Sequence, residues 1–588
     1  MDKESVEGIA GGPAMFSKQD DSLPADGTPH RPPLSVAEAP LYVDTPADID
    51  WTREVDIVVV GFGAAGACAA LQAHEEGADV VVLDRFNGGG ATAYSGGIVY
   101  AGATRVQARE GVDDDIEDMY RYLKVELRDA VEPETLRRFC EGSAADVDWL
   151  IDHGMPLTGT VFKEKTFYPP EKYSLYYSGN EKQLAQKIGA RPAPRGHRAL
   201  GKGYTGNVFF GTLRDAVERR KIDVVRHAPV TRLIVDRAGR VIGVEAQAVA
   251  EADTASHQAI FDSVTPLRPL DPEAQERDIE ACRKMECEQK VELVRIRARR
   301  GVVLATGGFV FNREKIAEVR PFVAAHLSAI VRLGSIGDDG SGMDLGCSVG
   351  GTVSRPDSFF INRSISPPAA LLEGVAVNQH GERFLNEDAY TGDLGAAIAK
   401  QPGGKAWLIL DRYSFLRALW QCVTAPRAEF KLLYAPTLLN IVAGGTRWGV
   451  SIRGLARKLG IEPDRLALTL AEYNRTSGIH RDPFGKLVDH LRPISDAPYF
   501  ALNLAVTNRF SFSKMFTLGG LRVDEKTGAV LTEGGEAIAG LYAAGRVAVG
   551  LCSGGYISGM SLADCVFSGR RAGRAASMER SAADLEAR

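Results

Sequence analysis

The 588-residue sequence contains no pair of cysteines separated by two residues. Its eight cysteines are scattered, so neither a zinc site nor an iron–sulfur cluster is indicated, and we predict no bound metal. Because scattered cysteines suit a reducing compartment, we expect a cytoplasmic location.

Long apolar runs are also missing. No stretch reaches the ~18 residues that would indicate a membrane span. The first 50 residues hold acids, prolines and glycines but no signal-peptide pattern, so we expect 1–50 to be an irregular extension that lies over the surface or stays mobile. The net charge of −6 argues against nucleic-acid binding.

Glycine, in contrast, is abundant, with 63 residues gathered in short runs. Residues 55–85 read VDIVVVGFGAAGACAALQAHEEGADVVVLDR, which predicts a strand, a glycine turn, an alanine-rich helix and a second strand that ends at Asp84. In this context Gly61 permits a tight turn, Gly63 lets the backbone approach a pyrophosphate, and Gly66 lets the helix pack on the strand. The helix N-terminus would bind the phosphates and Asp84 the ribose, so the motif predicts a dinucleotide site.

A second glycine-rich loop, GGGATAYSGGIVYAG (88–102), follows directly. A nicotinamide enzyme does not need such a loop, whereas a flavin ring must be flanked closely by backbone. The chain then carries VVLATGGFVFN (302–312), GSIGDDGSGMDLG (334–346) and GLYAAGRVAVG (540–550). In this order the motifs resemble the flavoprotein family of fumarate reductase, succinate dehydrogenase and the ketosteroid dehydrogenases, over about 53–577.

The resemblance implies an α/β fold with a Rossmann-like FAD-binding domain in two segments and an inserted α+β substrate (cap) domain. We place the FAD-binding segments at 51–355 and 506–580, the cap at 356–505, and a tail at 581–588. Within the first segment, 248–292 is polar and is expected to be a helical excursion between strands.

The resemblance also implies which residues bind the cofactor. Val230 occupies the position whose backbone contacts adenine, and the loop after the acid lacks the histidine of covalent relatives, so FAD should be non-covalent. The predicted cofactor-binding residues are Gly61, Gly63, Ala65, Gly66, Asp84, Arg85, Ala91, Thr92, Ser95, Gly96, Gly97, Val230, Ala305, Thr306, Gly307, Asp338, Gly545, Arg546, Ser561 and Leu562.

The substrate class is indicated by the absence of the arginines and histidines that bind dicarboxylates in the family. Binding of fumarate or succinate calls for fixed arginines and histidines. At the family's histidine positions the chain has apolar residues within KMFTLGG (514–520). A GANRLGGNS-like run is replaced by SGGYISGMS (553–561), and the family's proton-donating arginine by Ala389-Tyr390-Thr391. We therefore expect a cavity for a neutral, apolar molecule.

This pattern resembles the 3-ketosteroid dehydrogenases, and Tyr556-Ile557-Ser558-Gly559 resembles their Δ4 class, which acts on 5α-steroids. If 556–558 are extended, Tyr556 and Ser558 face one pocket. The resemblance assigns stabilisation of the enolate oxygen to Tyr556. It assigns proton abstraction at carbon 4 to Ser558 with help from Tyr390.

Simpler roles are open for these residues. Tyr556 could be a packed aromatic, Ser558 could be the N-cap of the helix that starts near Ser561, and Tyr413 or Tyr434 could replace Tyr390. Asp152 and His153 are expected to end a helix rather than to catalyse.

Residues 412–458 combine apolar and basic side chains. Such a surface can rest on a membrane, or its helices can cover the pocket or pack against a neighbouring subunit in an oligomer.

The sequence thus predicts an FAD-dependent oxidoreductase that acts on CH–CH groups and introduces the C4–C5 double bond into a 3-oxosteroid. Reduced flavin would pass its electrons to an acceptor that the sequence does not identify. A Δ1-dehydrogenase or a C=C reductase on another hydrophobic enone is the nearest alternative. A flavin electron-transfer subunit of a complex is an alternative of another class, which the lack of CxxC and CxxCH disfavours.

Overall fold

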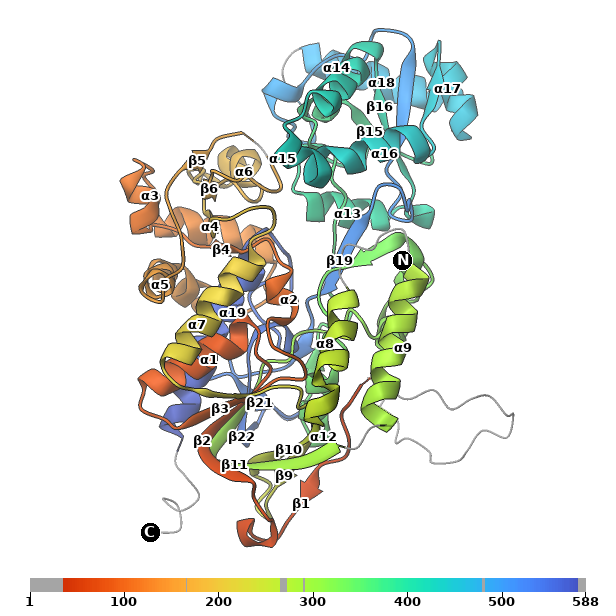
Figure 1. Cartoon of the computed structure of the whole chain (residues 1–588). Coiled ribbons are helices and arrows are strands. Elements are labelled where there is room, and N and C mark those ends of the chain that lie inside the picture. The colour runs from red at the N-terminus through yellow and green to blue at the C-terminus, as the bar shows by residue number, and fades with distance from the viewer. Residues whose placement is uncertain (1–34, 165, 265–271, 289–290, 479–481, 580–588) are drawn as a thin grey trace, which may run out of the picture.

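The structure, a computed structural model, describes residues 35–164, 166–264, 272–288, 291–478 and 482–579 (Figure 1). The expectations for 1–34 and for the tail lie outside the described residues. A lower lobe surrounds a large sheet, and an upper lobe holds a second, smaller sheet with its helices. The fold is mixed α/β, as the sequence predicts.

A nine-stranded sheet forms the centre of the lower lobe. Its strands run in the order β1 (Leu41–Tyr42), β9 (Val230–Val235), β10 (Val241–Val249), β11 (Val291–Leu304), β2 (Arg53–Val60), β3 (Val80–Leu83) and β8 (Asp223–Val225), while β22 (Ala537–Ala543) pairs with β11, and β21 (Ala529–Leu531) with β22. Strands β8, β3, β2, β11 and β22 are parallel. Valine dominates in β3 and at the carboxyl ends of β2 and β11, because these stretches are buried on both faces.

The central sheet joins both segments of the predicted FAD-binding domain, since β2 comes from the first and β22 from the second, with β11 between them. Strand β1 lies within the extension that was expected to be irregular, and it pairs with β9 at the edge of the sheet. Residues 35–50 therefore include a part that belongs to the sheet.

Three helices lie together on one side of this sheet, namely α1 (Ala64–Glu75), α7 (Gly206–Arg219) and α19 (Met560–Met578) (Figure 1). Helix α1 is rich in alanine because α19 approaches its backbone closely. A Cβ atom added at Gly569 or Gly573 would lie 2.5 and 2.3 Å from the carbonyl oxygens of Ala65 and Ala69.

The polar stretch between β10 and β11 forms two helices, α8 (Thr254–Ser263) and α9 (Pro272–Glu288), which confirms its expected helical character. In Figure 1 they stand on the other side of the molecule from α7 and α19.

The stretch from 84 to 205 adds a four-stranded sheet in the order β4, β7, β6, β5. Its elements are α2 (Gly90–Ala93), β4 (Ile98–Tyr100), α3 (Arg105–Arg109), α4 (Ile116–Leu127), α5 (Pro133–Asp152), β5 (Val161–Phe162), β6 (Leu175–Tyr176), α6 (Glu181–Ile188) and β7 (Gly196–Arg198).

The upper lobe is built on an antiparallel sheet in the order β15, β16, β18, β17. Its elements are β15 (Val375–Asn378), α13 (Thr391–Ala399), β16 (Ala406–Leu410), α14 (Arg412–Val423), α15 (Arg427–Glu429), the π-helix η6 (Phe430–Tyr434), α16 (Ala435–Ala443), β17 (Arg447–Gly449), α17 (Ile452–Leu459), α18 (Pro463–Gly478) and β18 (Tyr499–Asn503). All of them lie within the range that the sequence assigns to the cap.

A three-stranded sheet connects the two lobes, with β19 (Ser513–Thr517) between β12 (Ile330–Arg332) and β14 (Phe359–Ile361). The remaining elements of the lower lobe are α10 (Arg313–Val319), α11 (Pro321–Ala324), α12 (Ser341–Ser348), β13 (Val353–Ser354) and β20 (Gly520–Leu521).

Candidate functional site

A cavity of about 1000 Å³ runs from the carboxyl ends of β2 and β3 to the cap. It is lined by Tyr390, Tyr556 and Ser558 and by all the predicted cofactor-binding residues except Gly66 and Gly545. A Cβ atom at Gly66 would lie 1.8 Å from the Gly61 carbonyl oxygen, so Gly66 serves helix packing, as predicted. The N–H of Gly545 donates to Ser568 Oγ at 2.9 Å, away from the lining.

The glycine turn after β2 makes a cradle for an anion. Gly61 has φ +102°, and a Cβ there would lie 2.6 Å from the Ala305 carbonyl oxygen, so only glycine fits this approach. Gly63 is the N-cap of α1, and no side chain of its own caps the helix. The first amide of α1, the N–H of Ala64, donates to Thr92 Oγ1 at 3.0 Å. The start of the helix lines the cavity with Gly63 and Ala65, where the positive end of the helix dipole fits a pyrophosphate.

Asp84 is tied to the backbone of this turn. Its carboxylate accepts hydrogen bonds from the N–H of Phe62 (2.7 Å) and of Phe86 (2.8 Å). Burial raises the pKa of Asp84, and these N–H donors oppose the rise. The backbone of Gly88 contributes to the same stabilisation, and Asp84 lines the cavity, so its carboxylate is placed where the predicted bond from the ribose would form.

Arg85 binds acids on two other elements. Its guanidinium donates to both oxygens of Glu286 on α9 (2.6 and 2.7 Å) and to Asp339 before α12 (2.7 Å). The polar stretch 248–292 therefore contacts the wall of the cofactor cavity through Glu286. The sequence analysis did not predict this contact. Its polar composition gave no signal of this contact.

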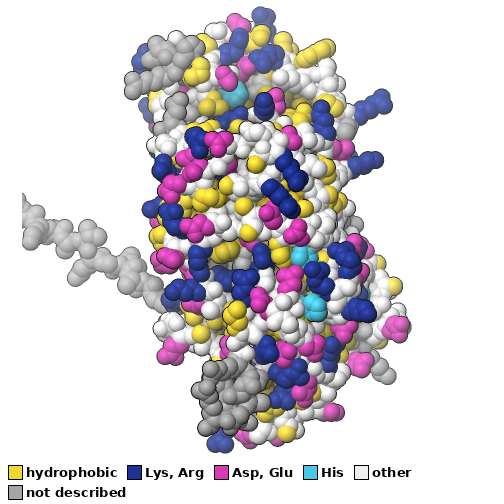
Figure 2. Space-filling view, turned by 90° about the vertical axis from the view of Figure 1, so that its left-hand side faces the viewer, with side chains coloured by type: hydrophobic (Ala, Val, Ile, Leu, Met, Phe, Trp, Pro, Cys, Tyr) yellow, Lys and Arg dark blue, Asp and Glu magenta, His cyan; other side chains and the backbone are white. Residues whose placement is uncertain are grey.

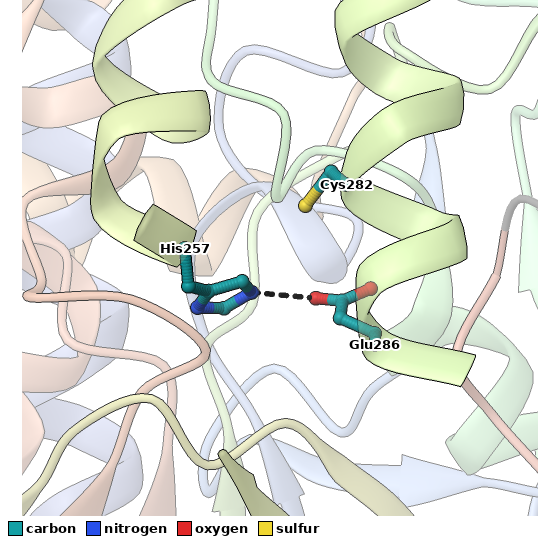
Figure 3. Close-up of side chains that lie close together, drawn as sticks. All are labelled: His257, Cys282 and Glu286. Carbon is teal, nitrogen blue, oxygen red and sulfur yellow. Dashed lines mark hydrogen bonds and ion pairs between the residues drawn. The ribbon is translucent and has the colours of Figure 1, made fainter. Parts of the chain in front are cut away.

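Glu286 also belongs to a cluster with His257 and Cys282, whose ligand atoms lie within 4.8 Å of one another (Figure 3). His257 Nε2 lies 3.1 Å from Glu286 Oε1, and Arg283 donates to Oε2 at 2.8 Å. Neighbouring Arg85 and Arg283 hold the pKa of Glu286 well below its usual range, despite the opposing effect of burial. The guanidinium groups of Arg85 and Arg283 already neutralise this carboxylate. We therefore interpret the cluster as a group that positions Arg85, not as a metal site.

Aromatic stacking extends this contact. The Phe86 ring stacks on His257 and lies 4.6 Å from both the His257 and the Phe261 ring centroids. Phe86, Phe261 and Tyr94 all line the cavity. Helix α8 therefore supplies part of the wall beside the predicted adenosine site.

Asp338 organises the opposite side of the cavity. It accepts hydrogen bonds from the N–H of Gly308 (2.9 Å) and Ser335 (2.7 Å) and from Arg546 Nη2 (2.8 Å). The buried Nη1 of Arg546 has no hydrogen-bond partner among the described residues. A buried unpaired donor in a cavity wall requires an acceptor, and FAD is rich in acceptors, so the residues present fit this cofactor.

The three predicted catalytic residues meet at one place. Tyr390 Oη and Ser558 Oγ are 3.0 Å apart and hydrogen-bonded. The Tyr556 ring packs edge-on against Phe360 (4.8 Å) and Phe516 (4.9 Å). Ile557 is fully buried while its two neighbours line the cavity, as an extended 556–558 predicts.

Both tyrosines are neutral near pH 7. Burial raises the pKa of Tyr556 well above its ordinary value, which Arg546 only partly opposes. Burial and neighbouring Tyr556 raise the pKa of Tyr390, although its bond with Ser558 lowers it. A third phenol, that of Tyr176 on β6, lies near Ser558, and its buried hydroxyl has no hydrogen-bond partner among the described residues. The sequence analysis did not identify this residue.

The simpler roles are not supported by the geometry. The N-cap of α19 is Gly559 rather than Ser558. Tyr413 is 44% exposed, and Tyr434 is not part of the cavity lining. His153 is the C-cap of α5, which ends at Asp152, as expected.

The cavity is not free of charge at its cap side. Lys514 on β19 and Lys431 on η6 line it, beside Pro436 of α16. The expectation of a cavity for a neutral, apolar molecule did not include these two cations at the rim. That expectation considered only the positions that are charged in the dicarboxylate-binding relatives, and Lys514 immediately precedes one of these positions in the sequence.

On the face shown in Figure 2, acidic and basic side chains are interspersed. Among the described residues, no helix combines the length and apolarity needed to cross a membrane.

Comparison with known proteins identifies the class. Residues 56–559 match the FAD binding domain family, to which the chain belongs. It is an FAD-dependent oxidoreductase with a two-segment FAD-binding fold.

Individual relatives are more specific. The chain is 34% identical over 512 residues to the 3-oxo-5-alpha-steroid 4-dehydrogenase of Comamonas testosteroni, covering 86% of this chain and 95% of that protein. It is 26% identical to an NADH:fumarate oxidoreductase of Klebsiella pneumoniae, across 89% of this chain but only 48% of that protein.

Among solved structures, the chain resembles the 3-ketosteroid-Δ4-(5α)-dehydrogenase of Rhodococcus jostii in complex with 4-androstene-3,17-dione. The TM-score is 0.75 with 30% identity, over 92% of this chain and all of that one. This structure therefore shares both fold and sequence with the chain.

Proposed function

We propose that the protein oxidises a 3-oxo-5α-steroid and introduces the C4–C5 double bond. The observation that carries this proposal is the group of three hydroxyls, Tyr390, Ser558 and Tyr556, on an aromatic wall of the cofactor cavity. The similarity to two Δ4-(5α)-type steroid dehydrogenases supports it.

Tyr556 is suited to bind the ketone oxygen of steroid ring A. Its neutral phenol donates a hydrogen bond to that oxygen and stabilises the negative charge that develops when C4 loses a proton. Phe360 and Phe516 pack against the Tyr556 ring from two sides. These aromatic neighbours exclude water from the phenol, which strengthens the hydrogen bond to the ketone oxygen.

Ser558 and Tyr390 suit the proton transfer. Ser558 Oγ takes the proton from C4 while its own proton passes to Tyr390 Oη, 3.0 Å away. Serine is a weak base, so Tyr390 must release its own phenolic proton toward solvent as it accepts the proton of Ser558. The bound FAD supplies a hydride acceptor for C5, and an electron acceptor must then reoxidise it.

A direct test is anaerobic mixing of the holoenzyme with a 3-oxo-5α-steroid in one arm and succinate in the other. Bleaching of the oxidised flavin absorbance by the steroid alone is the expected result. Bleaching by succinate, or by neither compound, contradicts the proposal.

We also propose that α14 contacts an anionic membrane surface. Leu416 (53% exposed), Trp420 (67%) and Val423 (65%) form one apolar stripe on this helix, since they are spaced by four and three residues. Exposed Arg412 and Arg427 flank the stripe without acidic partners among the described residues. Lys431 and Pro436 continue this segment to the rim of the cavity, where a sterol would enter.

Vesicle flotation tests the membrane contact. Binding to phosphatidylglycerol-containing vesicles should exceed binding to pure phosphatidylcholine, should fall with salt, and should be lost in Leu416→Ser/Trp420→Ser. Val450→Ser, at an exposed valine outside α14, is the control. No binding contradicts the contact; a dimer that the double variant dissociates would assign the stripe to a second copy instead.

A cytoplasmic location is consistent with the thiols. The seven cysteines that the structure describes are all free, as expected in a reducing compartment.

A further inference from the structure

One wall of the cavity changes from apolar to polar as it approaches the cap. Strands β14 and β19 are antiparallel, and Phe360 pairs with Phe516 beside Tyr556. The next row along the wall pairs Asn362 with Lys514, because the Asn362 N–H donates to the Lys514 carbonyl at 2.9 Å. Two residues of strand separate the rows by roughly 7 Å.

Side chains of this strand alternate as expected, so Lys514 and Phe516 share a face and both line the cavity. Thr517, at the end of β19, accepts from the Phe309 N–H at 3.1 Å, deep in the FAD-binding lobe. Lys514 is therefore displaced from the hydroxyl group cluster toward the cap.

Lys514 brings a positive charge to this row without a matching acid. Its Nζ donates to Tyr204 Oη at 3.1 Å and lies 5.5 and 5.9 Å from the ring centroids of Tyr204 and Phe167. Among the described residues, no ion pair within 4 Å joins this ammonium to a carboxylate. A half-buried ammonium in a mainly apolar cavity favours an anionic partner, since no carboxylate of the described part of the chain forms an ion pair with it.

We infer that Lys514 binds a carboxylate on the substrate, at the end of the steroid away from ring A. The inference rests on the proposed steroid function and narrows it to substrates with an acidic side chain. A steroid nucleus is longer than one row of the wall, so with its ketone at Tyr556 its far end extends past Phe516 toward Lys514. Asn362, opposite Lys514, also lines the cavity, and its Oδ1 accepts from the Lys514 N–H at 2.7 Å, which fixes the strand at this row.

The chemistry sets the expected size of the effect. An ammonium–carboxylate hydrogen bond in a partly dry site is stronger than one between neutral groups. Removing the charge on either partner should weaken binding by roughly tenfold or more. Proton abstraction at C4 occurs at Ser558 and should be unaffected.

Two matched substrates test the inference, a 3-oxo-5α-steroid with a side-chain carboxylate on ring D and the methyl ester of the same acid. Wild-type enzyme should show a KM for the acid roughly tenfold or more below that for the ester, with similar kcat. Lys514→Met should remove this preference, Lys514→Arg should keep it, and Lys526→Met, at an exposed lysine elsewhere, should change nothing.

A binding measurement without turnover completes the test. The 4-en-3-one product acid and its ester are titrated into each holoenzyme, and the shift of the flavin spectrum gives their dissociation constants. Equal affinities in wild type, or an acid preference that survives Lys514→Met, overturns the inference. Loss of FAD or of kcat on the ester in Lys514→Met also overturns it, since the lysine would then serve the fold or the chemistry.

The two proposals fail in different ways. If neither steroid is oxidised by any variant, the proposed function fails. If both are oxidised equally and Lys514→Met behaves like wild type, only the carboxylate site is overturned.

Discussion

At the scale of single residues, the proposed proton chemistry depends on Ser558, Tyr390 and Tyr556. Ser558→Ala removes the group next to C4, and Tyr556→Phe removes the donor to the ketone oxygen. Each variant should lose activity by about 10²–10⁴-fold, the usual contribution of a positioned acid or base. Steady-state assays on a 3-oxo-5α-steroid check this.

The bound flavin separates catalysis from folding in these variants. Both should retain yellow FAD with a normal spectrum, because neither hydroxyl supports the glycine turns that hold the cofactor. Tyr434→Phe, a cap tyrosine outside the cavity lining, is the matched control and should keep full activity. Cofactor loss in Ser558→Ala would mean that the serine serves the fold.

The positions of the residues at the site were predictable to different degrees. Tyr556, Ser558 and Tyr390 could be found from the sequence because they lie in motifs with a fixed neighbourhood. Tyr176 and Lys514 could not, because their surroundings come from the folding of the chain: β19 pairs with β14 and so places Lys514 in the cavity wall, and Tyr176 on β6 is buried near Ser558, outside the lining. Alternation along a strand identifies a face but not what that face contacts.

At the scale of elements, α9 stabilises the adenosine end of the site through Glu286. Glu286→Gln leaves buried Arg85 with Asp339 as its main acid. We expect a loss of about 3 kcal/mol of stability, typical of a broken buried ion pair, and weaker FAD binding. Thermal unfolding and FAD titration of apoprotein measure both.

The exposed Glu273, in the first turn of the same helix, offers the control. Glu273→Gln should match wild type in both measurements. Unchanged FAD affinity in Glu286→Gln would show that α9 does not support the cofactor site.

Strand β7 contains a buried histidine that gives the protein a pH dependence. His197 is fully buried between Thr104 (2.8 Å) and the Arg195 carbonyl (2.9 Å), and burial lowers its pKa to about 4. The unfolded chain binds a proton below about pH 6.5, whereas the folded chain does so only near pH 4. Stability is therefore highest above pH 6.5 and falls toward pH 4, by on the order of 3 kcal/mol.

Unfolding midpoints between pH 7.5 and 4.5 test this direction. His197→Gln should be less stable than wild type at pH 7.5 but should lose less on acidification. Parallel pH profiles of the two proteins would contradict a neutral buried His197.

The element pattern shows where sequence reasoning succeeds. Strands β2 and β3 and helix α1 were predictable because apolar runs, glycines and Asp84 occur in a fixed order. The role of α8 and α9 was not, because their polar sequence resembles a solvated surface while His257 and Glu286 are buried against Phe86 and Arg85.

At the scale of the whole molecule, the cavity lies where the lower lobe meets the cap. Both FAD-binding segments and the cap contribute to its lining, so activity requires the lobes together. The cap adds Tyr390 to the site, and β19 and β14 connect the lobes along its wall. The order of the motifs predicted this two-segment arrangement, whereas the charge of the cap-side rim depends on packing.

The most direct measurement is the position of the new double bond and the fate of the hydrogens it replaces. The holoenzyme is incubated with 5α- and 5β-3-ketosteroids deuterated at C4 or C5, with an artificial acceptor, and products are analysed by NMR and mass spectrometry. The account predicts a 4-en-3-one from the 5α substrate, with C5 deuterium lost to the flavin and one C4 deuterium lost to solvent. A 1-en-3-one product, or no product, would contradict it.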